Sequence, residues 1–254
     1  MEKQKVIFRD LGKMDYKEAW DYQESLLQEN TRKKSLVFSL ESGENVRNLT
    51  TLQRSPYGHD SRFTTKHYLL FVEHPPVYTL GKSGKPEHVL LGEKELEEKG
   101  IQFFKTNRGG DITFHGVQQI VGYPILDLEK FYTDIGRYLR ELEEVIILTL
   151  ADYGLTGKRS AGETGVWLDP EIPGRERKIC ALGVRTSRWI TMHGFALNVN
   201  TDLTYFNNII PCGIQHKQVT SLEKELGRKV SFEEAKERVK KNFELVFNVE
   251  LKKK

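Results

Sequence analysis

Apolar residues along the chain recur with two different spacings, and each spacing predicts a different kind of element. Short runs rich in β-branched and aromatic residues predict strands. Apolar residues three and four positions apart predict helices. The strand-like runs are 6–11, 68–72, 77–80, 101–105, 120–126, 166–168, 179–185 and 195–199, and the helical segments are 15–27, 93–99, 133–153 and 231–246.

Signals for helix ends accompany several of these segments. Asp15 with Glu18, and Ser231 with Glu234, have the spacing of a capping box, in which the first side chain accepts a hydrogen bond from the backbone three residues on. Gly154 follows the longest helical segment, as expected of a residue that ends a helix.

The order of the elements indicates how the chain is organised. Strands outnumber helices and the two are mixed, which predicts a single α+β domain over residues 1–254, built on a mixed sheet. Residues 31–66 are polar with few apolar clusters, so we expect a surface insertion there. Residues 220–254 are expected to form a C-terminal helical portion.

Composition narrows the class of protein. The 254 residues are 38% hydrophobic and 10% aromatic, which is enough for a core. A net charge of +3 argues against a nucleic-acid-binding protein and weakly favours an acidic partner. The N-terminal segment lacks the apolar region of a signal peptide, and no window approaches 18 apolar residues. We therefore expect a soluble, cytoplasmic protein without a membrane partner.

The chain contains two cysteines, which do not make a disulfide framework at this length. Cys212 lies between Pro211 and Gly213, so its thiol is expected on a bend rather than inside a regular element. A lone cysteine is more often a buried core residue than a nucleophile. Cys180, inside an apolar strand-like run, is predicted to be such a core residue.

A cysteine nucleophile needs a partner, because a thiol with a pKa of about 8.5 is only about one-tenth thiolate near neutral pH. His115 or His193 with Asn198 would give a papain-like arrangement. Lys178 is another candidate, since an ammonium group favours a neighbouring thiolate. Lys178 also lies in a charged run typical of an exposed surface, and the residues alone leave these alternatives open.

The segment 108–116, Arg-Gly-Gly-Asp-Ile-Thr-Phe-His-Gly, is unusual in composition. Its paired glycines permit a close approach of backbone N–H groups to a ligand, and Arg108 and His115 add a cation and a titratable donor. A tight turn between strands is the plainer interpretation. The chain has neither nucleotide-phosphate spacing nor metal-binding histidine spacing, so no cofactor or metal is expected.

Several blocks in order resemble the lipoyl(octanoyl) transferase family over roughly residues 67–225. The resemblance is specific because all blocks occur in the family's order. The blocks are His74–Gly81, Arg108–Gly116, Gly122–Leu128, Thr164–Trp167, Lys178–Arg185, Trp189–Val199 and Pro211–Ile214.

This resemblance implies a fold and an activity. The family shares the fold of the lipoate- and biotin-protein ligases. It transfers an octanoyl group from octanoyl-acyl carrier protein to a lysine of lipoyl domains, in 2-oxoacid dehydrogenases and the glycine cleavage H protein, as the first step of endogenous lipoate assembly. The cysteine matching Cys212 carries the acyl group as a thioester. The lysine matching Lys178 lowers the cysteine pKa and serves as acid and base.

The resemblance also implies an acyl-substrate pocket. Its residues are Arg108, Gly109, Gly110, Asp111, Ile112, Thr113, Phe114, His115, Ala181, Leu182, Gly183, Gly194, Phe195 and Ala196.

One segment departs from the family pattern. Val117-Gln118-Gln119 stands where the family usually has Pro-Gly-Gln, and the loss of a proline and a glycine predicts a changed loop backbone and pocket shape. Two rival functions remain: an ATP-dependent lipoate-protein ligase of the same fold, and a non-catalytic module that binds carrier or lipoyl domains. Cys212 favours the transferase, because a ligase has no use for a covalent thiol.

Overall fold

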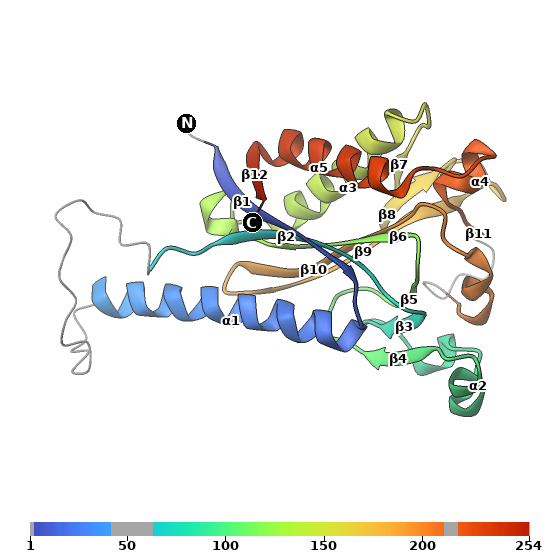
Figure 1. Ribbon diagram of the computed structural model, residues 1–254, viewed down its shortest axis with the longest axis horizontal. Coiled ribbons are helices and arrows are strands. Elements are labelled where there is room, and N and C mark those ends of the chain that lie inside the picture. The colour runs from blue at the N-terminus through green and yellow to red at the C-terminus, as the bar shows by residue number, and fades with distance from the viewer. Residues whose placement is uncertain (1–2, 42–62, 211–217, 254) are drawn as a thin grey trace.

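The computed structural model describes residues 3–41, 63–210 and 218–253. A twisted sheet forms the centre, with one long helix on one face and two helices on the other (Figure 1). A smaller sheet lies beside its lower edge in that view. The predicted mixed sheet with flanking helices is therefore confirmed.

The described chain forms twelve strands and five α-helices, with three short 3₁₀ helices. The strands are β1 (Gln4–Lys13), β2 (His67–Glu73), β3 (Val77–Leu80), β4 (Gln102–Lys105), β5 (Ile112–His115), β6 (Gln119–Ile125), β7 (Lys158–Ser160), β8 (Glu163–Leu168), β9 (Arg177–Ser187), β10 (Ile190–Asn198), β11 (Gln218–Val219) and β12 (Val249–Lys253). The helices are α1 (Tyr16–Glu41), α2 (Glu93–Glu98), α3 (Ile135–Ala151), α4 (Leu222–Leu226) and α5 (Phe232–Phe247), and the 3₁₀ helices are η1 (Pro86–His88), η2 (Leu128–Lys130) and η3 (Leu203–Asn208).

The large sheet has the strand order β12-β1-β2-β6-β10-β9-β8-β7, with β11 pairing beside β9. β1 pairs in parallel with both β12 and β2, and β11 is parallel to β9. The pairs from β2 through β6, β10, β9 and β8 to β7 are antiparallel. The small sheet has the order β4-β3-β5. Its strand β5 is formed by the segment that follows Arg108, and the chain then enters β6 of the large sheet.

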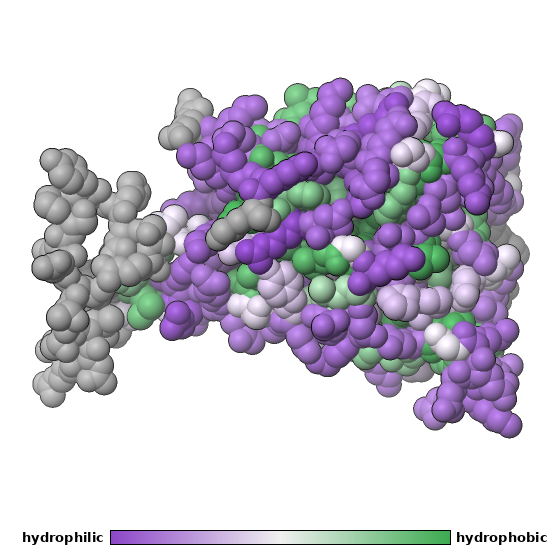
Figure 2. Space-filling model, viewed as in Figure 1, coloured by the Kyte–Doolittle hydropathy of each residue, from purple (hydrophilic) through white to green (hydrophobic). Residues whose placement is uncertain are grey.

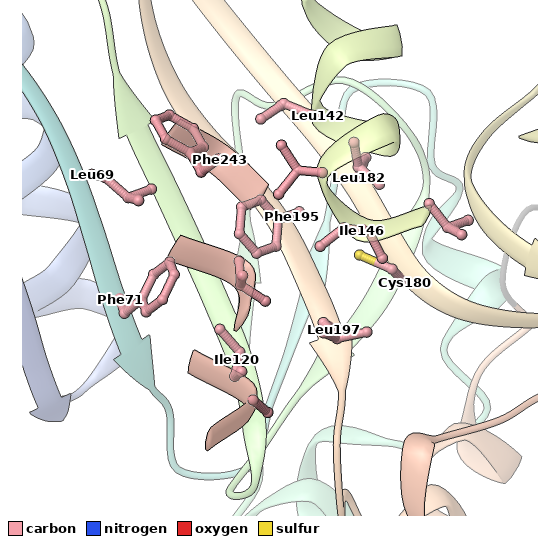
Figure 3. Close-up of a cluster of buried hydrophobic side chains, with 14 of the residues drawn as sticks. Leu69, Phe71, Ile120, Leu142, Ile146, Cys180, Leu182, Phe195, Leu197 and Phe243 are labelled. Carbon is pink, nitrogen blue, oxygen red and sulfur yellow. The ribbon is translucent and has the colours of Figure 1, made fainter. Parts of the chain in front are cut away.

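Both faces of the large sheet are covered, so its central strands are apolar on both sides. In β2, Leu69 and Phe71 belong to the cluster under α3 and α5, whereas Leu70 and Val72 belong to the cluster under α1. Figure 3 shows the α3 and α5 side, where Phe195 lies at the centre of the packed side chains. Full burial of one leucine, valine or phenylalanine side chain stabilises the fold by roughly 1.5–3 kcal/mol.

Helix α1 is longer than the apolar pattern predicts. It continues to Glu41, so the first part of the expected surface insertion 31–66 is helical, and Thr65 at its other end is buried. Polar contacts hold this half of the helix: the Asn30 side chain bonds both the N–H and the carbonyl of Lys66, and Lys34 pairs with Asp127. Residues 42–62 of the expected insertion lie outside the described residues.

The C-terminal portion is not only helical. The chain ends in β12, which adds to the edge of the large sheet beside β1, with Val6 opposite Leu251. Helix α5 packs on α3 and places Val239 and Phe243 in the main core. Its predicted capping residue is confirmed, since the Ser231 side chain accepts a hydrogen bond from the Glu234 N–H.

Polar side chains cover most of the face seen in Figure 2, with small apolar areas scattered among them. Within the described residues, no helix combines the length and the apolar character needed to cross a lipid bilayer.

Candidate active site

A cavity of about 360 Å³ lies on the α1 side of the large sheet, between that sheet and the small one. Strands β6, β9 and β10 form its wall, and Val121, Tyr123 and Ala196 face it from positions that also pack toward α1. The volume is within the range of about 300–1,000 Å³ that is usual for small-molecule sites. The lining mixes apolar side chains with a few polar groups, as expected of a pocket that binds an organic substrate.

A β-bulge determines which way Lys178 points. Trp167 of β8 pairs with Lys178, but the next residue, Val166, pairs with Cys180, so Ile179 is an extra residue in β9. Ile179 and Cys180 both lie in the core under α3. In a regular strand without this bulge, Lys178 would share the face of Cys180, because side chains two residues apart point to the same side. With it, Lys178 lines the cavity together with Ala181.

The Lys178 side chain is partly buried and held on two sides. Its Nζ donates a hydrogen bond to the Thr164 carbonyl oxygen at 3.2 Å. The same Nζ lies 4.6 Å from the centre of the Trp167 ring, close enough for a cation–π interaction. The ammonium group is thus positioned at the cavity wall by β8.

Arg108 brings a second cation to the cavity. Its guanidinium donates to the Thr79 carbonyl oxygen at 2.5 Å, to the Thr79 hydroxyl at 2.9 Å and to the Gly109 carbonyl oxygen at 2.9 Å. Gly183 makes room for this arrangement, because a Cβ there would lie 2.7 Å from the Gly109 carbonyl oxygen and 3.2 Å from the Arg108 side chain. The backbone of the glycine-rich segment therefore packs directly against β9.

Histidine and tyrosine side chains form a buried polar cluster next to the cavity. The His74 Nδ1–H donates to the Met14 carbonyl oxygen at 2.8 Å, so its Nε2 accepts from the Tyr123 hydroxyl at 2.8 Å. The rings of Tyr16 and His115 stack with centres 5.9 Å apart. The His193 Nε2–H donates to the Asn107 side-chain oxygen at 2.7 Å.

Burial keeps this cluster neutral. Desolvation lowers the pKa of His74 to about 4 and, with the nearby Arg108 charge, that of His193 to about 3. Burial also holds the pKa of His115 well below its ordinary value. The same cause raises the pKa of Tyr16 to about 12. At neutral pH the described cations that line the cavity are therefore Arg108 and Lys178.

A chain of hydrogen bonds connects the cluster to the backbone of Lys178. The His115 Nδ1–H donates to the Gln119 side-chain oxygen, and the Gln119 amide donates to the Asn198 side-chain oxygen. The Asn198 amide then donates to the Thr220 carbonyl oxygen at 3.0 Å. The Thr220 N–H donates to the Lys178 carbonyl oxygen at 2.9 Å, so the cluster and the lysine share one polar network.

The structure brings most of the sequence-predicted pocket residues together. Those that line the cavity are Arg108, Gly110, Asp111, Ile112, Thr113, His115, Ala181, Leu182, Gly183, Gly194, Phe195 and Ala196. Two do not line it: the Gly109 N–H bonds the Val184 carbonyl oxygen, and Phe114 stacks on Tyr205 in a separate apolar cluster.

Of the two cysteines, the structure describes Cys180 and not Cys212. Cys212, together with Pro211 and Gly213, lies outside the described residues. Cys180 is fully buried, as the sequence predicts, among Ile146, Leu182 and Leu197 (Figure 3). Burial raises the pKa of its thiol, which therefore stays protonated.

The backbone after Gly116 does not need the glycine that the resemblance led us to expect. Gln118 has φ +60°, the left-handed conformation that glycine adopts most easily. Its carbonyl oxygen accepts hydrogen bonds from the Val199 and Asn200 N–H groups, and these contacts hold the conformation. The chain therefore adopts the left-handed conformation at Gln118 without a glycine, and the changed pocket shape expected from the resemblance stays a prediction.

Sequence reasoning missed several residues that line the cavity, including Tyr16, Gln119 and Tyr123. Tyr16 falls on the apolar face of a helix about 90 residues before the glycine-rich segment. The only sequence signal for Gln119 and Tyr123 was their place in or beside the matching blocks. No local pattern distinguishes a cavity-lining tyrosine from a core tyrosine.

Comparisons with known proteins agree with this geometry. The family model described as lipoyl protein ligase A/B catalytic domain matches residues 15–244. An octanoyltransferase from Christiangramia forsetii is 56% identical over 248 residues, 97% of either chain. One from Flavobacterium psychrophilum is 58% identical over 244 residues, 96% of this chain and 97% of the relative.

Solved structures show the same fold at low identity. A bi-partite lipoate protein ligase from Thermoplasma acidophilum has a TM-score of 0.64 at 17% identity, covering 100% of this chain and 87% of that one. Lipoate-protein ligase A bound with ATP has a TM-score of 0.63 at 16% identity, covering 100% and 89%.

Proposed function

From the premise that the chain belongs to the octanoyltransferases of the lipoyl protein ligase A/B catalytic domain family, we propose how it transfers its acyl group. The donor is octanoyl-acyl carrier protein and the acceptor is a lysine of a lipoyl domain. Cys212 carries the octanoyl group as a thioester, and Lys178 is its partner. The enzyme acts in the cytoplasm, during lipoate assembly.

The position of Lys178 is the observation that carries this proposal. The bulge in β9 turns its ammonium group toward a cavity with room for a medium-length acyl chain. A lysine on a charged surface would not need a bulge, a carbonyl acceptor and an aromatic ring around it. These contacts support a catalytic lysine over an ordinary exposed one.

The chain connectivity supports pairing Lys178 with Cys212. Val219 pairs with Lys178 in parallel register, and Cys212 precedes Val219 by only seven residues in the sequence. The proposal therefore requires only that this short segment place the Cys212 thiol beside the Lys178 ammonium group. The buried histidines are less suitable partners, because their low pKa values make them weak bases.

In the first half-reaction, the Cys212 thiolate attacks the thioester carbonyl carbon of the donor. A carbon–sulfur bond to Cys212 forms, and the bond to the carrier's thiol breaks. The Lys178 ammonium favours the attacking thiolate by its charge and gives a proton to the departing thiolate. No ATP is consumed, because the donor thioester is already activated.

In the second half-reaction, the amine of the lipoyl-domain lysine attacks the octanoyl-Cys212 thioester. A carbon–nitrogen bond forms, the carbon–sulfur bond to Cys212 breaks, and the neutral Lys178 amine accepts the proton from the attacking nitrogen. This restores the thiolate beside an ammonium group. The product is an amide, which is more stable than the thioester.

Intact-protein mass spectrometry tests the proposal. Incubation with octanoyl-acyl carrier protein is expected to add one octanoyl mass to the enzyme, and a lipoyl domain should then remove it. Cys212→Ser should abolish the adduct, and Lys178→Met should slow its formation by at least about a hundredfold, as for loss of a general acid–base group.

Two further arms test the rival functions. Octanoate with ATP but no carrier protein is expected to give no octanoyl-lipoyl domain, whereas an ATP-dependent ligase would make it. A binding module would form complexes without any transfer. An adduct that persists in Cys212→Ser would overturn the thioester assignment.

A further inference from the structure

Helix α3 carries a buried carboxylate at the edge of its apolar face. Glu143 is fully buried among the residues that pack α3 against the sheet. A buried carboxylate is costly unless its oxygens are paired. Its contacts therefore show what this residue does for the fold and for the site.

Both oxygens of Glu143 are engaged. Oε2 pairs with the Arg159 Nε at 3.1 Å, and Oε1 pairs with the Arg140 guanidinium at 3.0 Å. Oε1 also accepts a hydrogen bond from the Gly165 N–H at 2.9 Å. The two arginines account for the charge, and the contact with Gly165 leads to the active site.

The Gly165 N–H and the Thr164 carbonyl belong to the same peptide group. That carbonyl oxygen is the acceptor for the Lys178 Nζ at 3.2 Å. One flat peptide therefore connects Glu143 on one edge with the Lys178 ammonium on the other. An acceptor on the N–H fixes the plane of the peptide and strengthens its carbonyl as an acceptor.

The peptide also depends on glycine at position 165. Gly165 has φ +130°, a conformation that side-chain-bearing residues rarely adopt. A Cβ there would lie 2.7 Å from the Cys180 carbonyl oxygen and 3.2 Å from the Lys178 Cε. This glycine gives the peptide little intrinsic conformational preference, so an external contact has to fix its orientation.

We propose that Glu143 is a positioning residue for Lys178: it orients the Thr164–Gly165 peptide so that the carbonyl holds the ammonium at the cavity wall. The inference rests on the proposed role of Lys178 in acyl transfer. Glu143 is not among the described residues that line the cavity, so its effect has to act through the peptide.

The competing explanation is that Glu143 matters only as an ion-pair partner of Arg140 and Arg159. Two substitutions separate the explanations, because each keeps one property of the side chain. Glu143→Gln keeps the length and the oxygen that reaches the Gly165 N–H, but loses the charge. Glu143→Asp keeps the charge, but draws the oxygens back by one carbon.

The test measures kcat and KM for acyl transfer from octanoyl-acyl carrier protein. Glu143→Asp is expected to lower kcat about tenfold, which corresponds to about 1.4 kcal/mol, the size of one hydrogen bond, with KM for the donor unchanged. Glu143→Gln is expected to stay within about threefold of the wild type. The matched control is Glu144→Gln, since Glu144 pairs with Arg159 at 2.6 Å but does not contact Gly165.

Melting temperatures measured on the same samples separate activity from stability. If Glu143→Asp keeps the wild-type kcat, or if Glu143→Gln loses as much as Glu143→Asp, the positioning role is wrong. Lys178→Met distinguishes failure of the inference from failure of the proposed function. If Lys178→Met retains transfer, the proposed function fails; if it abolishes transfer while the two Glu143 variants behave alike, only the inference fails.

Discussion

Mild acid is expected to destabilise this protein through its buried histidines. Burial lowers the pKa of His67 and of His74 to about 4 and contributes most to lowering that of His193 to about 3. Unfolding exposes the imidazoles and returns them to a pKa near 6.5. The unfolded chain therefore binds protons first, and stability present above pH 6.5 is lost as the pH falls toward 4.

The magnitude follows from the two pKa values. At pH 5 an imidazole of pKa 6.5 is almost fully protonated, whereas one of pKa 4 is almost fully neutral. This difference in protonation lowers the free energy of unfolding by about 2 kcal/mol for each histidine. Three such groups give a loss of about 5 kcal/mol between pH 7 and pH 5, a large part of the roughly 5–15 kcal/mol that stabilises most proteins.

Urea unfolding followed by tryptophan fluorescence at pH 7, 6 and 5 measures this loss. His67→Gln is a suitable variant, because His67 packs against Phe131 and accepts from the Asp127 N–H, away from the cavity lining. Whatever its stability at pH 7, the variant should lose about 2 kcal/mol less than the wild type on acidification.

Carboxylates do not account for the same window. The pKa values of Glu29, Asp169 and Glu225 are lowered by their basic partners, so their contribution is lost only below about pH 4.5. A free energy of unfolding that stays constant within about 1 kcal/mol from pH 7 to pH 5 would refute the reasoning. An unchanged pH slope in His67→Gln would refute the assignment to that histidine.

Three further changes test the packing and the backbone. Phe243→Ala removes a fully buried ring that stacks on Phe247 and should cost about 3–5 kcal/mol in urea unfolding; a loss below 1 kcal/mol would contradict the packing. Gln118→Ala should be about 1 kcal/mol less stable than Gln118→Gly, because both lose the same side chain and only glycine relaxes at φ +60°; equal stability would show no strain there. Gly165→Ala should reduce acyl transfer at least about tenfold by displacing Lys178, and an unchanged kcat would contradict the close approach.

Local sequence patterns predicted the elements that have a clear apolar spacing and a recognisable start or end signal. Strand β3 has the predicted bounds, α5 begins directly after its predicted capping residue Ser231, and α3 ends shortly before the predicted stop at Gly154. The second half of α1 was missed because its contacts are polar and distant in sequence, such as Lys34 with Asp127. The first half of β10 was missed because buried polar residues, including Thr191 and His193, interrupt its apolar pattern.

The site was predictable only where the resemblance covered it. It pointed to Lys178 and the glycine-rich segment, but the orientation of Lys178 depends on the extra residue Ile179 in β9. A bulge is a property of the pairing of two strands, so neither strand's sequence contains it. Glu143 has a typical helix-forming sequence context, and its role depends on a peptide more than 20 residues away.

Lys178 is held in two separate ways, and this separation predicts how stability and activity divide. Its backbone is fixed by pairing with Trp167 and Val219 and by the hydrogen bond from the Thr220 N–H. Its ammonium group is held by the Trp167 ring and by the peptide that we propose Glu143 orients. Loosening that peptide leaves the strand pairing intact, so kcat can fall while the strand stays folded. Breaking the pairing would lower stability and activity together, which is why the two quantities have to be measured on the same variants.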